Sequence, residues 1–144
     1  MILRNFFACL ALLLIAPLAA AQDAAPQDQP GLIVRAGESW IFSIKDGQPA
    51  DPRKVADDAK PAKGELMVTL DIAGATVMTV ANNDEGWWNY RAFIVVKPGH
   101  KGNRTSTCTL MNGGREAFEQ WPEAIAAIRL ADFTPAGDGD LRCG

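Results

Sequence analysis

The chain contains 144 residues, of which 48% are hydrophobic, and it carries a formal net charge of −3 at pH 7. This length suits a single domain rather than two. The mild acidity argues against nucleic acid or an anionic membrane as a partner, because both require a positive field. With one histidine in the chain, few arrangements for acid–base or metal chemistry are open to it.

The N-terminal segment follows the pattern of a secretory signal peptide. Arg4 provides a short positive region, residues 6–18 form an apolar run, and Ala19–Ala21 supply the small residues of a cleavage site. A membrane anchor is the alternative, but a spanning helix needs about 20 apolar residues, and Pro17 interrupts this run near its end. We therefore expect cleavage after Ala21, a periplasmic or secreted location, and no membrane insertion of the mature chain.

The predicted organisation has three parts. Residues 1–21 are the signal peptide, and residues 22–30 form a flexible polar leader rich in Ala, Pro, Gln and Asp. Residues 31–144 form a single β-rich domain, in which we find no internal repeat.

Short apolar runs separated by turn residues predict strands through most of this domain. The clearest case is the alternation of Leu66, Val68, Leu70 and Ile72, which places four apolar side chains on one face. The predicted strands lie at 31–35, 39–45, 65–72, 76–80, 87–96 and 104–111.

Three other segments are interpreted differently. The polar, proline-flanked segment 51–63 predicts an exposed loop, with at most one helical turn near 52–59. Residues 115–121 predict a helical turn before Pro122. For residues 122–130 a short helix or turn is favoured, followed by a strand at 128–133; a strand through the whole segment is the alternative.

The three cysteines divide between the first and the last predicted part. Cys9 lies in the apolar run and is removed with the signal peptide, which leaves Cys108 and Cys143. Two cysteines in an oxidising compartment most often pair. A reactive or metal-binding pair would need further ligands, which one histidine hardly provides. We therefore predict a structural disulfide, which is worth about 4 kcal/mol in the chain-entropy model.

Short strands, frequent turns and one disulfide predict an all-β fold. The expected architecture is a small antiparallel β-sandwich of immunoglobulin-like shape, and a small closed β-barrel is the alternative. An antibody-type domain sets its two cysteines on facing strands around a core tryptophan. Because Cys143 is nearly terminal, the expected likeness is one of shape and not of family.

The most unusual local feature is an aromatic cluster, Trp87, Trp88 and Tyr90, followed by Arg91. In a strand, Trp87 and Asn89 face one side, whereas Trp88 and Tyr90 face the other. One tryptophan is therefore expected to enter the core, and the other to stay partly exposed, where it could stack on a sugar ring or hold a partner. We take Trp87, Trp88, Tyr90 and Arg91 as a candidate binding surface; the alternative is a central strand covered on both faces.

No motif for catalysis stands out. The chain lacks the HExxH, Cys-x-x-Cys and Gly-x-Ser-x-Gly patterns. His100 lies between lysines in a Pro/Gly loop, which is typical of a solvated residue, and hydroxyls such as those of Ser106 and Thr107 have no supporting motif. Glu116 and Glu119 are interpreted as a solvated helix face rather than as an acid–base pair.

These observations favour a non-enzymatic exported β-sandwich that binds a protein or an envelope component, without metal or cofactor. The alternative is a small hydrolase or an enzyme inhibitor in the same compartment. An inhibitor would present an exposed loop, for which residues 51–63 or 97–103 could serve. A hydrolase would place His100 in a pocket against a carboxylate and a hydroxyl.

Overall fold

The computed structural model describes residues 29–144. The predicted signal peptide and residues 22–28 of the predicted leader lie outside the described residues. From residue 29 onward the chain forms nine strands and no helix. The strands are β1 (Leu32–Arg35), β2 (Glu38–Lys45), β3 (Gln48–Val55), β4 (Leu66–Ile72), β5 (Thr76–Asn82), β6 (Trp87–Ile94), β7 (Asn103–Thr105), β8 (Arg115–Trp121) and β9 (Ala127–Ala136).

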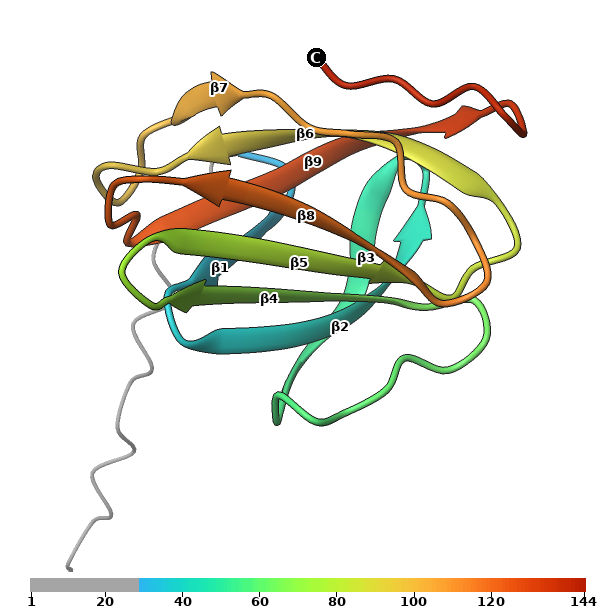
Figure 1. The fold of residues 1–144 in the computed structure, drawn as a ribbon, viewed down its shortest axis with the longest axis horizontal. Coiled ribbons are helices and arrows are strands. Elements are labelled where there is room, and N and C mark those ends of the chain that lie inside the picture. Colours follow the sequence, from blue (N-terminus) through green and yellow to red (C-terminus); the bar gives the residue numbers. More distant parts are fainter. Residues whose placement is uncertain (1–28) are drawn as a thin grey trace, which may run out of the picture.

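Two antiparallel sheets pack face to face, as Figure 1 shows. The four-stranded sheet has the order β1-β9-β6-β7, and the five-stranded sheet has the order β3-β2-β4-β5-β8. The prediction of an antiparallel β-sandwich is confirmed, and the closed-barrel alternative is wrong. Because the strand orders differ from the ABED and CFG sheets of an immunoglobulin constant domain, the likeness is one of shape.

The core lies between the sheets and follows the period-two alternation of the strands. On the five-stranded side, Leu66, Val68 and Leu70 of β4 face inward beside Met78 and Val80 of β5, and all five are fully buried. Burial of each such side chain contributes about 1.5–3 kcal/mol. The predicted alternation in residues 65–72 is therefore confirmed for Leu66, Val68 and Leu70, whereas Ile72 at the end of β4 is 47% exposed.

The four-stranded side of the core is aromatic. The rings of Tyr90 and Phe133 stack with their centroids 5.5 Å apart, and Phe42 from the opposite sheet meets Phe133 edge-on at 5.7 Å. Offset-stacked and edge-to-face pairs of this kind add about 0.5–1.5 kcal/mol beyond burial. These three rings join the two layers.

The prediction of a loop with one helical turn at 51–63 is wrong in its first part. Residues Gln48–Val55 form β3, an edge strand that pairs with β2. Pro49 and Pro52 fit there because edge strands tolerate a missing backbone donor. Most side chains of β3 are exposed or half-buried, so its sequence does not alternate between apolar and polar residues. Such a sequence is hard to distinguish from that of a loop.

The helical predictions in the last third are also wrong. Residues Arg115–Trp121 form β8, which pairs with β5 along its whole length. Residues 122–126 form an irregular connection with bends that leads into β9, so the helix considered for 122–130 is absent, and the strand expected at 128–133 is present but longer than predicted. Long-range pairing here outweighs the local helix preference of alanine and glutamate.

The predicted strand at 104–111 is interrupted. Residues Asn103–Thr105 pair with β6, whereas Cys108 pairs with Cys143 and Leu110 with Trp88 through isolated bridges. The segment changes partners twice and cannot form one continuous ladder.

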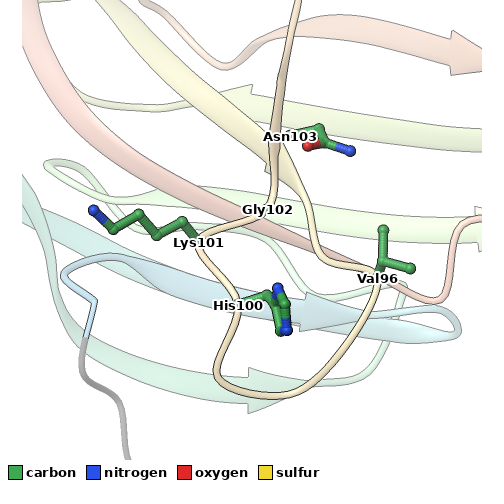
Figure 2. A pocket seen from close by; sticks show the side chains of 5 residues that line it. All are labelled: Val96, His100, Lys101, Gly102 and Asn103. Atoms are coloured by element: carbon green, nitrogen blue, oxygen red, sulfur yellow. The ribbon is translucent and has the colours of Figure 1, made fainter.

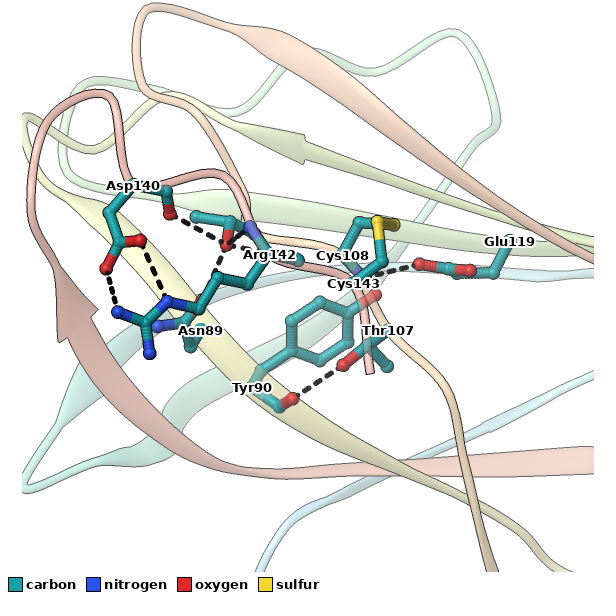
Figure 3. The surroundings of a disulfide bond; sticks show 9 residues. Asn89, Tyr90, Thr107, Cys108, Glu119, Asp140, Arg142 and Cys143 are labelled. Carbon is teal, nitrogen blue, oxygen red and sulfur yellow. Dashed lines mark hydrogen bonds and ion pairs between the residues drawn. A yellow bond between two sulfur atoms is a disulfide. The ribbon is translucent and has the colours of Figure 1, made fainter.

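The predicted disulfide between Cys108 and Cys143 is confirmed (Figure 3). It joins the C-terminal segment to the chain after β7, where the Gly144 amide donates to the Thr107 carbonyl at 3.0 Å. The Thr109 amide donates to the Arg142 carbonyl at 2.8 Å. The tail is thus fixed by backbone bonds as well as by the covalent link.

Residues 29–144 include no helix of the length and hydrophobicity needed to cross a bilayer.

Candidate functional site

The structure divides the aromatic cluster between the two faces of β6. Tyr90 is 5% exposed and belongs to the core. Trp88 packs against the core from the same side, and its Nε1 donates to Asp84 at 2.8 Å. Trp87 is half-buried on the outer side, where its Nε1 donates to Asn112 at 3.2 Å. The side chains of the predicted binding surface, Trp87, Trp88, Tyr90 and Arg91, therefore lie on two faces of β6.

Arg91 is exposed and lies beside a bulge in β9. At this point one residue of β6 faces two residues of β9, and Asp132 takes a positive φ of 53°. The Asp132 carboxylate accepts from Arg91 at 3.5 Å and from Gln48 at 3.0 Å. The bulge thus turns Asp132 toward two donors and neutralises the charge of Arg91.

His100 lines a pocket of about 290 Å³ in the loop between β6 and β7 (Figure 2). In Figure 2, His100 and Val96 project from the two limbs of the loop, and Lys101 points away from it. The lining consists of Val96, His100, Lys101, Gly102 and Asn103. It includes no carboxylate and no hydroxyl group, so at this pocket His100 has neither of the partners that the hydrolase alternative requires.

A second pocket is a groove on the outer face of the five-stranded sheet, with a volume of about 260 Å³. Its floor is formed by Met67 and Thr69 of β4 and by Thr79 and Ala81 of β5. The antiparallel register places Met67 opposite Ala81, and Thr69 opposite Thr79. Because three of these four side chains are small, the surface of the sheet is depressed along its middle.

The two walls of this groove come from different elements. Glu116 and Phe118 of β8 stand on one side, since the register places Glu116 opposite Ala81 and Phe118 opposite Thr79. The Phe118 ring is 62% exposed. Residues 57–61 of the β3–β4 loop supply the other wall.

Hydrogen bonds hold the β3–β4 loop against the sheet. The Asp57 carboxylate accepts from the Ser39 hydroxyl at 2.7 Å, and Ser39 also bonds with Thr69 at 2.9 Å. Farther along the loop, the Asn83 amide donates to the Pro61 carbonyl at 2.9 Å. The wall is therefore attached at two points and does not depend on a ligand for its position.

The groove carries more negative than positive charge. Asp57, Asp71 and Glu116 line it together with a single cation, Lys60. In the part of the chain that the structure describes, no ion pair involves Asp71 or Glu116. Their charges are available to a cationic ligand group.

A further group of polar side chains surrounds the disulfide, where the Tyr90 ring points toward Cys108 and Cys143 (Figure 3). Burial, with the nearby negative charge of Glu119, raises the pKa of the Tyr90 hydroxyl. Burial also raises the pKa of Glu119, although its Oε1 accepts from the Cys108 amide at 2.7 Å. Tyr90 is buried, Cys108 and Glu119 are half-buried and Cys143 is exposed, and we assign this cluster to the structure of the domain rather than to ligand binding.

No group of three or more His, Cys, Asp or Glu residues within 29–144 is arranged to hold a metal ion. Comparison with known proteins finds no matching family model, no matching curated protein and no matching solved structure. The geometry of the grooves and surfaces is therefore the basis for a functional proposal.

Sequence reasoning missed the groove because it missed the strand β8. In the structure Glu116, Phe118 and Gln120 face outward, whereas Ala117, Glu119 and Trp121 face the other side. The sequence does not show this period of two, because Ala117 and Phe118 are adjacent apolar residues and Glu119 and Gln120 are adjacent polar ones. The helix preference of the individual residues pointed away from a strand as well.

Proposed function

We propose that this chain is an exported, non-enzymatic β-sandwich domain that binds a partner protein in the groove over β4 and β5. The observation that carries the proposal is the groove itself. It has a floor of hydroxyl and apolar groups, a wall that is already fixed in place, and an exposed phenylalanine on the opposite wall. Preformed concave sites with a few polar groups are the usual places for ligands.

The groove favours a lysine or arginine side chain of the partner. Asp71 and Glu116 offer carboxylates on either side of the floor, and Phe118 offers an aromatic ring beside them. A cationic head can pair with the carboxylates, while its aliphatic stem packs on the ring. The ligand is therefore a segment of a secreted or envelope protein with an exposed basic residue.

Two observations support export. The Cys108–Cys143 disulfide is typical of oxidising compartments, and residues 1–21 have the signal-peptide pattern. The intact mass of the protein recovered from its compartment should correspond to a chain that begins at Gln22. Recovery of a chain that keeps Met1 in the membrane fraction would contradict this.

The binding proposal is tested by capture from an extract of the native envelope, followed by mass spectrometry. Asp71→Asn combined with Glu116→Gln removes two groove charges and should abolish capture of a partner that the unmodified protein retains. Phe118→Ala should weaken the same interaction at least about tenfold, as expected for an aromatic anchor.

A matched control removes the same number of negative charges from positions outside the groove. Glu123→Gln combined with Asp138→Asn removes two exposed carboxylates that do not line the groove. This variant should capture the partner as the unmodified protein does, and all variants should unfold at the same temperature. Equal loss in the groove variant and the control would refute a site in the groove.

A further inference from the structure

The charge of the chain is divided unevenly between its two layers. The strands of the four-stranded sheet contain four arginines and one carboxylate, Asp132. Asp132 is already paired with Arg91. Between Glu85 and Glu116 the sequence contains no aspartate or glutamate. This layer is therefore locally positive, although the whole chain is acidic.

The positive groups gather at the end of the sheet where β6 leads into β7. Phe93 lies between Arg104 of β7 and Arg129 of β9 in one cross-strand row. Lys97 and Lys101 in the connecting loop are exposed, as is Arg104. None of these three exposed cations forms an ion pair within residues 29–144.

Arg129 holds the loop in place from below. It is 5% exposed, and its guanidinium lies 4.1 Å from the centre of the Phe93 ring. It donates to the carbonyls of Pro30 and Lys101 at 2.7 and 2.9 Å. Arg129 thus adds positive charge beneath the surface and fixes the backbone that carries Lys101.

The same loop presents an apolar side chain among these cations. Val96 is 69% exposed and precedes Lys97 directly. The loop is folded closely on β6 at Gly102, where a Cβ atom would stand 2.7 Å from the Ile94 carbonyl oxygen. Val96 therefore projects from a compact loop, with Lys101 on the opposite limb (Figure 2).

We propose that Val96, Lys97, Lys101 and Arg104, here called the basic loop surface, dock the domain on a membrane that contains anionic phospholipids. Lysine and arginine near such a membrane are attracted to its negative surface potential, and an exposed apolar side chain among them enters the headgroup region. The acidic net charge does not oppose this contact, because exposed charges farther away than about 8 Å are largely screened at physiological salt. The inference does not depend on the groove.

The test is sedimentation of the exported protein with vesicles. One set contains equal parts phosphatidylcholine and phosphatidylglycerol, and the other contains phosphatidylcholine alone. Binding is expected to the first set, to weaken as salt is added, and to be absent or much weaker with the second. Because every variant has the same N-terminus, any contribution of residues 1–28 is common to all.

Two variants examine the basic loop surface. Each cation near the membrane is worth about fivefold in affinity, so Lys97→Gln, Lys101→Gln and Arg104→Gln together should weaken binding on the order of a hundredfold. Val96→Asp should weaken it while leaving the cations in place. The matched control, Lys45→Gln, Lys63→Gln and Arg115→Gln, removes three exposed cations that lie outside the basic loop surface and the groove, and it should bind nearly as the unmodified protein does.

Four results would overturn the proposal. These are no binding to phosphatidylglycerol vesicles at low salt, equal binding to both vesicle types, equal loss in the loop variant and the control, and an unchanged loop variant. Binding of inorganic phosphate or of an RNA oligonucleotide at the same surface, with no vesicle binding, would also overturn it, since it would assign the surface to another anion.

Discussion

The two outer faces of the sandwich arise from the same alternation of side chains, yet one is hollow and the other is filled. On the five-stranded sheet, the outward positions of β4 and β5 include Thr69, Thr79 and Ala81, and a groove results. On the four-stranded sheet, the outward positions of β6 and β9 include Phe93 and Arg129, and the guanidinium covers the ring.

This difference shows that the size of the outward side chains decides the shape of each face: small residues leave a groove on one, and Arg129 covers Phe93 on the other. Inward side chains decide stability instead. Substitutions between the layers should therefore lower stability without altering either face, whereas substitutions on a face should alter binding without lowering stability.

The largest effect is expected for Trp88→Ala. This ring packs against the core, so its removal should cost about 3–5 kcal/mol of unfolding free energy. Trp87→Ala, one residue away on the outer side, should cost about 1 kcal/mol. Denaturant unfolding of both variants measures the difference. Equal costs would mean that the outer face of β6 is as important for stability as the core.

The second largest loss of unfolding free energy is expected when the disulfide is removed. Replacing both Cys108 and Cys143 by serine should lower the unfolding free energy by about 2–4 kcal/mol, because the unfolded chain gains freedom. The bond lies away from the groove, so partner capture below the unfolding transition should remain. If capture disappears while the variant is still folded, the tail contributes to the groove.

Two carboxylates should respond to pH in opposite directions. Burial raises the folded-state pKa of Glu119 above 4.5, so folded Glu119 holds its proton more tightly than unfolded Glu119. Stability from this group is fully present below 4.5 and is lost as the pH rises through the folded pKa. Glu119→Gln should remove this loss. An unchanged slope of stability against pH above 4.5 would contradict the assignment.

Glu65 provides the opposite case on the five-stranded layer. Its hydrogen bonds from Arg53, together with the Ala62 amide, lower its pKa below 4.5. Stability from Glu65 is therefore present above 4.5 and is lost as the pH falls through the folded pKa. Glu65→Gln should flatten the acid side of the profile, which the same titration of thermal unfolding against pH would detect.

The smallest effect on stability is expected for Ala81→Leu, which fills the groove from its floor. The side chain points outward, so the unfolding free energy should change by no more than about 0.5 kcal/mol. Partner capture should nevertheless be lost, because the leucine occupies the ligand volume. Retained capture would place the binding surface elsewhere.

The parts of the fold that sequence reasoning predicted are those in which local pattern and burial agree. Leu66, Val68 and Leu70 alternate in sequence and are buried in the structure. The disulfide followed from the count of cysteines that remain after Cys9. In these cases a single physical argument was sufficient.

The remaining parts depend on contacts between distant segments. Nothing local reveals that β3, with two prolines, completes an edge beside β2, or that residues 57–61 fold over β4. The position of Trp88 against the core was predicted only as one of two choices, because alternation fixes relative sides but not which side is inward. The groove depends on two such long-range placements, residues 57–61 against β4 and β8 beside β5.

The position of β9 has a consequence for how the domain is made. β9 lies between β1 and β6, so β1 has no partner in its sheet, and β6 pairs only with the short β7, until β9 is in place. Such long-range pairing slows folding, and without β9 the strand β1 would be unpaired in its sheet and one edge of β6 would be open. The four-stranded layer is thus completed only when residues 127–136 are available, whereas every strand of the five-stranded layer precedes them in the chain.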